Sequence, residues 1–147
     1  MKGSRRLSRE LALQGLYQWL VNQVDADEIL AQIGDKDGYA KSDRAYLESL
    51  VRNVLDDVVT LREKVSPYLD RPIEQLSPIE HALLLMAASE LASQPGTPYR
   101  VIINESVELA KIYGGTDGHK YVNGVLDKLA AELRAHETGL RNNKGVG

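Results

Sequence analysis

The chain has 147 residues, which is close to the size of one domain, and 43% of them are hydrophobic, which is enough for a buried core. It contains no cysteine, which excludes disulfide bonds, thiolate metal sites and a cysteine nucleophile, and no phenylalanine, which leaves aliphatic side chains to build a core suited to helix packing. The net charge of −3 argues against a protein that coats nucleic acid over its whole surface.

The start of the chain predicts helices separated by a short loop. Apolar residues recur at the spacing of one helical face over residues 4–23. A shorter helix is predicted over residues 25–33, with Gly34 as its stop, and residues 35–38 are predicted to be a loop. Ser42 is then expected to cap one long helix that runs to Pro67.

The clearest start signal is Ser77-Pro78-Ile79-Glu80, a capping box with proline at the first helical position. Residues 82–88 are apolar on almost every side, which predicts a helix at the centre of a bundle. A loop at 93–98 and two further helices at 100–113 and 117–136 follow. We therefore expect a single all-helical domain over residues 1–136.

Composition also predicts the state of the carboxyl-terminal tail and the cellular location of the protein. Residues 137–147 are rich in glycine and asparagine, and we expect them to be disordered. No stretch approaches the roughly 18 apolar residues that span a bilayer. Arg9 and Glu10 interrupt the first leucines, so no signal peptide is predicted. We expect a cytoplasmic protein with no membrane association.

The usual signs of catalysis are missing from the sequence. His81, His119 and His136 are not spaced as a helical metal-binding pair, and no glycine-rich phosphate loop follows a strand. The acidic pair Asp56-Asp57 is interpreted as part of a solvated helix face. We expect no enzyme, and no catalytic residue, metal or cofactor.

Three arginines open the first predicted helix. Arg5, Arg6 and Arg9 lie among residues 1–9, which hold no acidic residue. Cations at the positive end of a helix cost about 0.3–1 kcal/mol each, so helix stability does not explain them. A bound phosphate chain would explain them, because it meets both guanidinium groups and free backbone N–H groups. A merely solubilising helix end is the alternative, and both interpretations stay open.

A second candidate binding cluster lies around the start of the last helix. Lys120 suits a phosphate, and the ring of Tyr121 suits a base, with stacking worth about 1–3 kcal/mol. Asp117 is equally a helix N-cap, and Tyr121 is equally a residue at the edge of the core. Tyr17, Tyr68 and the pair Tyr99-Arg100 give a weaker signal of the same kind.

The order of several segments resembles the NusB family of transcription antitermination factors. The likeness covers residues 4–134 and is most specific in its last two segments. These segments are Arg5-Arg6 with Arg9-Glu10, Gln14-Gly15-Leu16-Tyr17, Asp70-Arg71-Pro72, Ser77-Pro78-Ile79-Glu80, Asn104-Glu105-Ser106-Val107-Glu108-Leu109-Ala110-Lys111 and His119-Lys120-Tyr121-Val122-Asn123-Gly124-Val125-Leu126-Asp127.

The resemblance implies an all-α fold of about seven helices in two small packed bundles. It also implies binding of single-stranded boxA-type RNA together with NusE, a small-subunit ribosomal protein. The pair would join RNA polymerase in an antitermination complex that resists termination, notably in ribosomal RNA transcription. Homodimerisation of the free protein stays open, because exposed apolar residues on the partner face are suited to self-association.

The resemblance also implies site residues by position. The residues that it places at an RNA surface are Arg5, Arg6, Arg9, Tyr17, Tyr68, Tyr99, Arg100, Asp117, Lys120 and Tyr121. The residues that it places at the NusE surface are Tyr17, Leu20, Glu80, Tyr113 and Tyr121. Two rival interpretations remain: a protein-interaction scaffold in which the arginines have no role, and a domain of an RNA methyltransferase, although no catalytic domain follows here.

Overall fold

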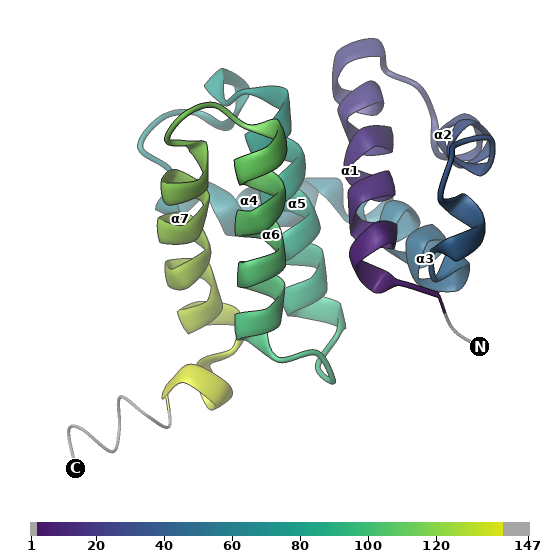
Figure 1. The fold of residues 1–147 in the computed structure, drawn as a ribbon. Coiled ribbons are helices and arrows are strands. Elements are labelled where there is room, and N and C mark those ends of the chain that lie inside the picture. Colours follow the sequence, from purple (N-terminus) through teal and green to yellow (C-terminus); the bar gives the residue numbers. More distant parts are fainter. Residues whose placement is uncertain (1–2, 140–147) are drawn as a thin grey trace.

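The computed structural model describes residues 3–139, and over that part its regular structure is entirely helical (Figure 1). Seven α-helices are joined by loops and three short 3₁₀ turns. The elements are α1 (Arg5–Asn22), α2 (Ala26–Gly34), η1 (Tyr39–Lys41), α3 (Arg44–Asp56), α4 (Val58–Val65), η2 (Ser66–Tyr68), η3 (Ile73–Gln75), α5 (Pro78–Ser93), α6 (Tyr99–Tyr113) and α7 (Gly118–Leu133).

The first bundle consists of α1, α2 and α3, which lie together on one side of the molecule (Figure 1). Ser4 caps α1 by accepting a hydrogen bond from the backbone N–H of Leu7 at 3.0 Å. Helices α1 and α2 approach each other closely at Gly15. A Cβ atom there would lie 2.5 Å from Ile29 and 2.8 Å from Ile33, so glycine allows the two helices to meet.

The predicted long helix after residue 42 differs from the structure at its start and in its middle. The N-cap is Asp43, whose carboxylate accepts from the backbone N–H of Tyr46, because the Ser42 hydroxyl donates instead to the carbonyl of Tyr39. At Asp57 the backbone leaves helical geometry, with φ −107° and ψ 17°, and divides the segment into α3 and α4. Negative charge at this junction opposes the dipole of α3 and favours the start of α4.

Helix α5 occupies the centre of the molecule, as its sequence predicts. Every residue from 81 to 91 is buried. Pro78 occupies the first turn, and the Ser77 hydroxyl accepts from the backbone N–H of Glu80 at 3.2 Å. Because α5 contacts α1, α3, α4, α6 and α7, both bundles share it as a common core.

The second bundle consists of α5, α6 and α7. A buried arginine, Arg134, links its helices at the end where α5 finishes and α6 begins. Arg134 donates to the carbonyl oxygens of Leu91 and Gln94, both at 2.8 Å, where α5 ends. It also pairs with Glu137 at 2.7 Å, and Glu137 accepts from the backbone N–H of Tyr99, the first residue of α6. One buried side chain therefore ties the end of α5 to the beginning of α6.

The predicted fold class is confirmed: over residues 3–139, helices pack as two small bundles around α5 (Figure 1). The expected disordered tail differs in its first part, because residues 135–139 form a further helical turn. That turn is held by Thr138, whose hydroxyl donates to the carbonyl of Arg134. The rest of the expected tail, residues 140–147, lies outside the described residues.

Candidate functional site

One end of the molecule gathers three of the predicted tyrosines, and we call it the tyrosine end. There α1 and α6 finish, and α5 and α7 begin (Figure 1). Tyr17 lies in the last turns of α1, Tyr113 is the final residue of α6, and Tyr121 is in the first turn of α7. All three side chains are half-buried, so each ring has one part fixed by the protein and another part open to solvent.

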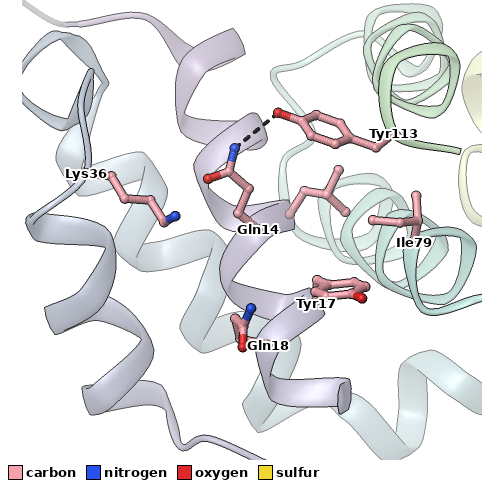
Figure 2. Close-up of a pocket in the computed structure, with 7 residues that line it drawn as sticks. Gln14, Tyr17, Gln18, Lys36, Ile79 and Tyr113 are labelled. Atoms are coloured by element: carbon pink, nitrogen blue, oxygen red, sulfur yellow. Dashed lines mark hydrogen bonds between the residues drawn. The ribbon is translucent and has the colours of Figure 1, made fainter. Parts of the chain in front are cut away.

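A cavity of about 410 Å³ opens between α1, α5 and α6 at this end. In Figure 2 the ring of Tyr17 lies beside Ile79 from the first turn of α5, while Gln14 reaches across to Tyr113. Its lining residues are Leu13, Gln14, Tyr17, Gln18, Lys36, Ile79 and Tyr113. The mixture of apolar walls with a few convergent amide and phenol groups is typical of a surface that binds another molecule.

The hydroxyl of Tyr113 is held by two residues of α1. It donates to a carboxylate oxygen of Glu10 at 2.6 Å and accepts from the amide of Gln14 at 3.1 Å. The hydrogen bond to Glu10, together with burial, raises the pKa of Tyr113. The phenol therefore stays protonated, and its directional hydrogen bonds join α6 to α1 beside the cavity.

Tyr121 is held by the loop between η2 and η3. Its hydroxyl accepts from the backbone N–H of Asp70 at 3.2 Å, and the guanidinium of Arg71 lies 5.2 Å from the centre of its ring. Arg71 makes two hydrogen bonds to the carboxylate of Asp70, at 2.7 and 3.0 Å. The hydrogen bonds from Arg71 and Tyr121 lower the pKa of Asp70 to about 2.

The half-buried side chain of Glu80 lies against the amino end of α7. A Cβ atom on Gly118 would lie 3.0 Å from a carboxylate oxygen of Glu80, so the absence of a side chain there makes room for this carboxylate. A negative charge at a helix amino end is favourable. Together with Arg71 and Tyr121, Glu80 and residues 115–118 line a second cavity, of about 330 Å³.

Asp117 and Lys120 form an exposed ion pair beside this cavity. Their charged groups are 3.4 Å apart, and their side chains are 76% and 73% exposed. Asp117 precedes α7, but its side chain makes no capping hydrogen bond, so the predicted capping role is not observed. Exposed pairs of this kind contribute only about 0–1 kcal/mol, and Lys120 can therefore exchange Asp117 for a ligand at small cost.

The predicted arginine cluster lies where α1 begins, at the opposite end from the tyrosines, and its cations have partners (Figure 1). Arg5 lies 3.6 Å from Asp43 and stacks over the ring of Tyr46, 4.3 Å from its centre. Arg6 pairs with Glu105 at 3.0 Å. Arg5 and Arg6 therefore both have a carboxylate partner within the protein. Arg6 remains accessible, with 72% of its side chain exposed.

Arg9 is a core residue in this structure. Its guanidinium is buried and pairs with the buried carboxylate of Glu90 at 2.9 Å, and the Tyr46 hydroxyl donates to the same carboxylate. Burial and the negative charge of Glu90 raise the pKa of Tyr46. The side chains come from α1, α3 and α5, so this buried cluster joins the two bundles. The expectation of an RNA contact by Arg9 does not fit its burial.

The other predicted residues lie apart from the tyrosine end or at its margin. Tyr68 donates to Glu132 on α7 at 2.7 Å. Arg100 lies 5.6 Å from the ring centre of Tyr99 at the start of α6, which is the same end as the start of α1. Leu20, near the end of α1, is half-buried against the core.

The structure also identifies residues that the sequence did not single out. Gln14, Ile79 and Arg71 line the two cavities at the tyrosine end, and each lies within a segment that carried the family resemblance. Across residues 3–139 no cluster of histidine and acidic residues is arranged to hold a metal ion. No helix in that part of the chain is long and apolar enough to cross a membrane.

The NusB family model matches residues 6–131 of this chain. A protein of Burkholderia lata described as transcription antitermination protein NusB is 58% identical over 142 residues, which are 97% of this chain and 98% of the relative. A protein of the same description from Burkholderia mallei is 58% identical over 140 residues, covering 95% and 97%.

Two solved structures share the fold. T. maritima NusB superposes with a TM-score of 0.81 and 29% identity, covering 90% of this chain and 94% of that one. A crystal structure of the antitermination factors NusB and NusE in complex with dsRNA gives a TM-score of 0.76, with 22% identity and coverage of 87% and 96%.

Proposed function

This chain belongs to the NusB family, and from that membership we propose that it is a transcription antitermination factor that binds RNA together with NusE. The observation that carries the proposal is the match to antitermination proteins along almost the whole chain at 58% identity. In the fuller form of the proposal, the RNA is a single-stranded boxA-type element. The assembly then joins RNA polymerase and resists termination during ribosomal RNA transcription.

The tyrosine end supports a protein partner. Tyrosines are enriched among the residues that dominate protein interfaces, and here Tyr17 and Tyr113 line an open cavity with apolar walls. We propose that NusE contacts this cavity and the neighbouring Leu20, Glu80 and Tyr121. The same surface is available for homodimerisation of the free protein, and sedimentation at several concentrations tests that second use.

The RNA surface is proposed to exclude Arg9 and to use the exposed cations. Arg6, Lys120 and Arg100 are exposed, and their phosphate contacts would release counterions. Arg5 is a weaker candidate, since it also stacks on Tyr46. Tyr68 and Tyr99 stay proposals of the same kind. The related complex named above contains double-stranded RNA, so the preference for a single strand needs its own test.

One titration tests the proposal. The anisotropy of a labelled single-stranded boxA-type RNA is measured against the protein with and without NusE, at several salt concentrations, beside a scrambled strand and a duplex. We expect tight, sequence-dependent binding only with NusE. Because each single-strand phosphate contact contributes roughly −0.7 to the log–log salt slope, Arg6→Ala should flatten that slope by about this amount.

The buried arginine supplies a contrast to Arg6. We expect Arg9→Met to leave the salt slope unchanged in protein that remains folded, because a buried guanidinium meets no phosphate. If NusE binds but neither strand binds with or without it, the chain is a protein-interaction scaffold, and the RNA part of the proposal is wrong. Equal binding of the boxA-type and scrambled strands would contradict only the preference for boxA.

A further inference from the structure

The ion pair between Arg6, in the first turn of α1, and Glu105, in the middle of α6, is uneven in its exposure. The Arg6 side chain is 72% exposed, whereas the Glu105 side chain is only 17% exposed. Both hydrogen bonds of the pair are donated by Nε of Arg6, at 3.0 and 3.3 Å to the two carboxylate oxygens. The carboxylate is therefore fixed by the protein, and it holds the guanidinium by Nε alone.

This contact leaves the outer edge of the guanidinium open to a ligand. Among residues 3–139, the two terminal nitrogens of Arg6 have no hydrogen-bond partner. A cavity of about 440 Å³ lies beside the pair, between Arg6 and α6. The terminal nitrogens of an arginine match two oxygens of a phosphate, because both groups present their hydrogen-bonding atoms as a fork. Arg6 can therefore bind a phosphate without releasing Glu105.

The carboxylate of Glu105 acts on a bound polyanion in two opposite ways. Its negative charge repels the phosphates, but this repulsion is offset by the charge of Arg6 and is screened by salt. Its hydrogen bonds restrict Arg6 before RNA arrives, and ordering a free side chain of this length on binding lowers affinity by about 2- to 10-fold. Because a phosphate meets the outer edge of the guanidinium, away from Nε, we expect the ordering effect to be the larger.

We propose that Glu105 is a positioning residue for RNA binding: it holds Arg6 by Nε, so that the outer edge of the guanidinium is set to receive a phosphate of the bound strand. The inference rests on the proposed function and adds to it a residue of α6 that acts only through Arg6. Since Arg6 lies on α1 and Glu105 on α6, the orientation of this cation depends on how the two bundles pack.

The sign of the change in RNA affinity tests the inference. Electrostatics alone predicts that loss of a carboxylate strengthens binding to a polyanion. With NusE present, we expect Glu105→Ala instead to weaken binding of boxA-type RNA by about 2- to 10-fold. Glu108→Ala is the matched control, because it removes the same charge one turn further along α6 and lines the same cavity, but Glu108 pairs with Lys111 at 3.5 Å. Glu108→Ala should not weaken binding.

Two further variants separate positioning from a structural role. Glu105→Gln keeps an oxygen that can accept from Nε of Arg6, and it should restore most of the lost affinity. In an Arg6→Ala background, Glu105→Ala should cause no further loss, because no guanidinium remains to be held. The free energy of unfolding of Glu105→Ala should stay close to that of the wild type in urea, since exposed ion pairs contribute little to stability.

Four outcomes would overturn the inference while leaving the proposed function intact. Unchanged or tighter RNA binding by Glu105→Ala would mean that the carboxylate does not prepare Arg6 for RNA. Wild-type affinity in Arg6→Ala would mean that this cation meets no phosphate. Equal losses from Glu105→Ala in the wild-type and Arg6→Ala backgrounds would mean that Glu105 acts through another group. Weaker binding of NusE alone to Glu105→Ala would place a protein at this pair instead of RNA.

Failure of the wild-type protein to bind the RNA with NusE has a different meaning. That result would refute the proposed function itself, and the role of Glu105 with it. The wild-type titration is therefore completed before the variants are compared.

Discussion

Arg9 shows how an arginine at the start of a helix becomes a core residue. Its guanidinium pairs with Glu90 and lies 5.5 Å from the ring centre of Tyr46, in a cluster where each polar group has a partner. Among residues 3–139 no buried side-chain nitrogen or oxygen lacks a hydrogen-bond partner. A buried charge of this kind is costly once its partner is removed, because water cannot replace the lost interaction.

Removal of one partner from this cluster should therefore destabilise the fold strongly. We expect Arg9→Ala to reduce the free energy of unfolding by about 3–5 kcal/mol, measured by urea denaturation. The double variant Arg9→Met with Glu90→Leu should lose less free energy of unfolding than Arg9→Met or Glu90→Leu alone, because each single variant leaves one buried charge without its partner. Equal stability of Arg9→Ala and the wild-type protein would contradict the buried pair.

Gly15 offers a second test at the scale of one residue. Because its missing side chain lets Ile29 and Ile33 approach α1, Gly15→Ala should overpack this contact and cost about 1–3 kcal/mol of the free energy of unfolding. Gly124 on α7 is the matched control, since nothing lies within 4 Å of its Cβ position. Gly124→Ala should stabilise by about 0.4–1 kcal/mol in the same urea measurement.

His81 makes the stability depend on pH. Burial and the neighbouring Arg62 lower its pKa from the ordinary 6.5 to about 4, although Glu74 acts in the opposite direction. The unfolded chain therefore takes up a proton below pH 6.5 that the folded protein resists until about pH 4, so stability falls as pH falls through this window.

The expected loss between pH 7 and pH 5 is on the order of 2 kcal/mol. Denaturation by urea at both values measures it. His81→Gln keeps an acceptor for the Arg62 Nε–H, which reaches His81 at 3.3 Å, and should show a smaller pH dependence. If the free energy of unfolding falls equally between pH 7 and pH 5 in the wild type and in His81→Gln, titratable groups other than His81 cause the pH dependence.

At the scale of the helices, Arg134 replaces an ordinary helix cap. The end of α5 has no glycine to turn the chain, and its final carbonyl groups are instead satisfied by this one guanidinium. We expect Arg134→Met to destabilise by about 2–4 kcal/mol, because buried carbonyl groups are left without donors. Urea denaturation measures the change, and Arg52→Met on the surface of α3 is the control with an expected effect near zero.

Local sequence predicted the helices well where a start signal and a buried pattern agree. Ser77 and Pro78 begin α5 as predicted, because their signals are local and nothing competes for them. The sequence did not predict the N-cap at Asp43, because Ser42 and Asp43 are both suitable caps. In the structure the Ser42 hydroxyl donates to the carbonyl of Tyr39 in η1, so Asp43 caps α3. The break at Asp57 has no proline or glycine to announce it.

The candidate site was predictable only in part, for the same reason. Tyr17, Tyr113 and Tyr121 lie on three helices, and the family resemblance rather than their spacing placed them together. The role of Arg9 was misjudged, because its partner Glu90 is distant in sequence and a periodic pattern does not show which charges meet. Arg71 was missed because its importance depends on the ring that it covers.

At the scale of the whole molecule, the two proposed RNA-contacting ends are separate. Arg6 lies where α1 begins, and Tyr121 lies where α7 begins, at the opposite end of the bundles (Figure 1). One RNA strand that contacts both must cross the molecule. Shortening the strand from one side should therefore abolish the effect of Arg6→Ala on affinity while retaining that of Tyr121→Ala, or the reverse.

Anisotropy with a series of shortened strands, in the presence of NusE, measures this separation. Lys120 should follow Tyr121 in the series, because both belong to the first turn of α7. If the effects of Arg6→Ala and Tyr121→Ala disappear at the same strand length, the RNA does not extend between the two ends.

The position of Arg134 late in the chain also affects the order in which the protein can fold during synthesis. During synthesis the chain emerges from its amino end, and α5 is complete long before Arg134 leaves the ribosome. Until then the carbonyl groups of Leu91 and Gln94 have no donor from this side chain. The nascent protein therefore cannot complete the packing around the end of α5 until α7 and Arg134 have been translated, although α1, α3 and α4 can cover other faces of α5 before that point.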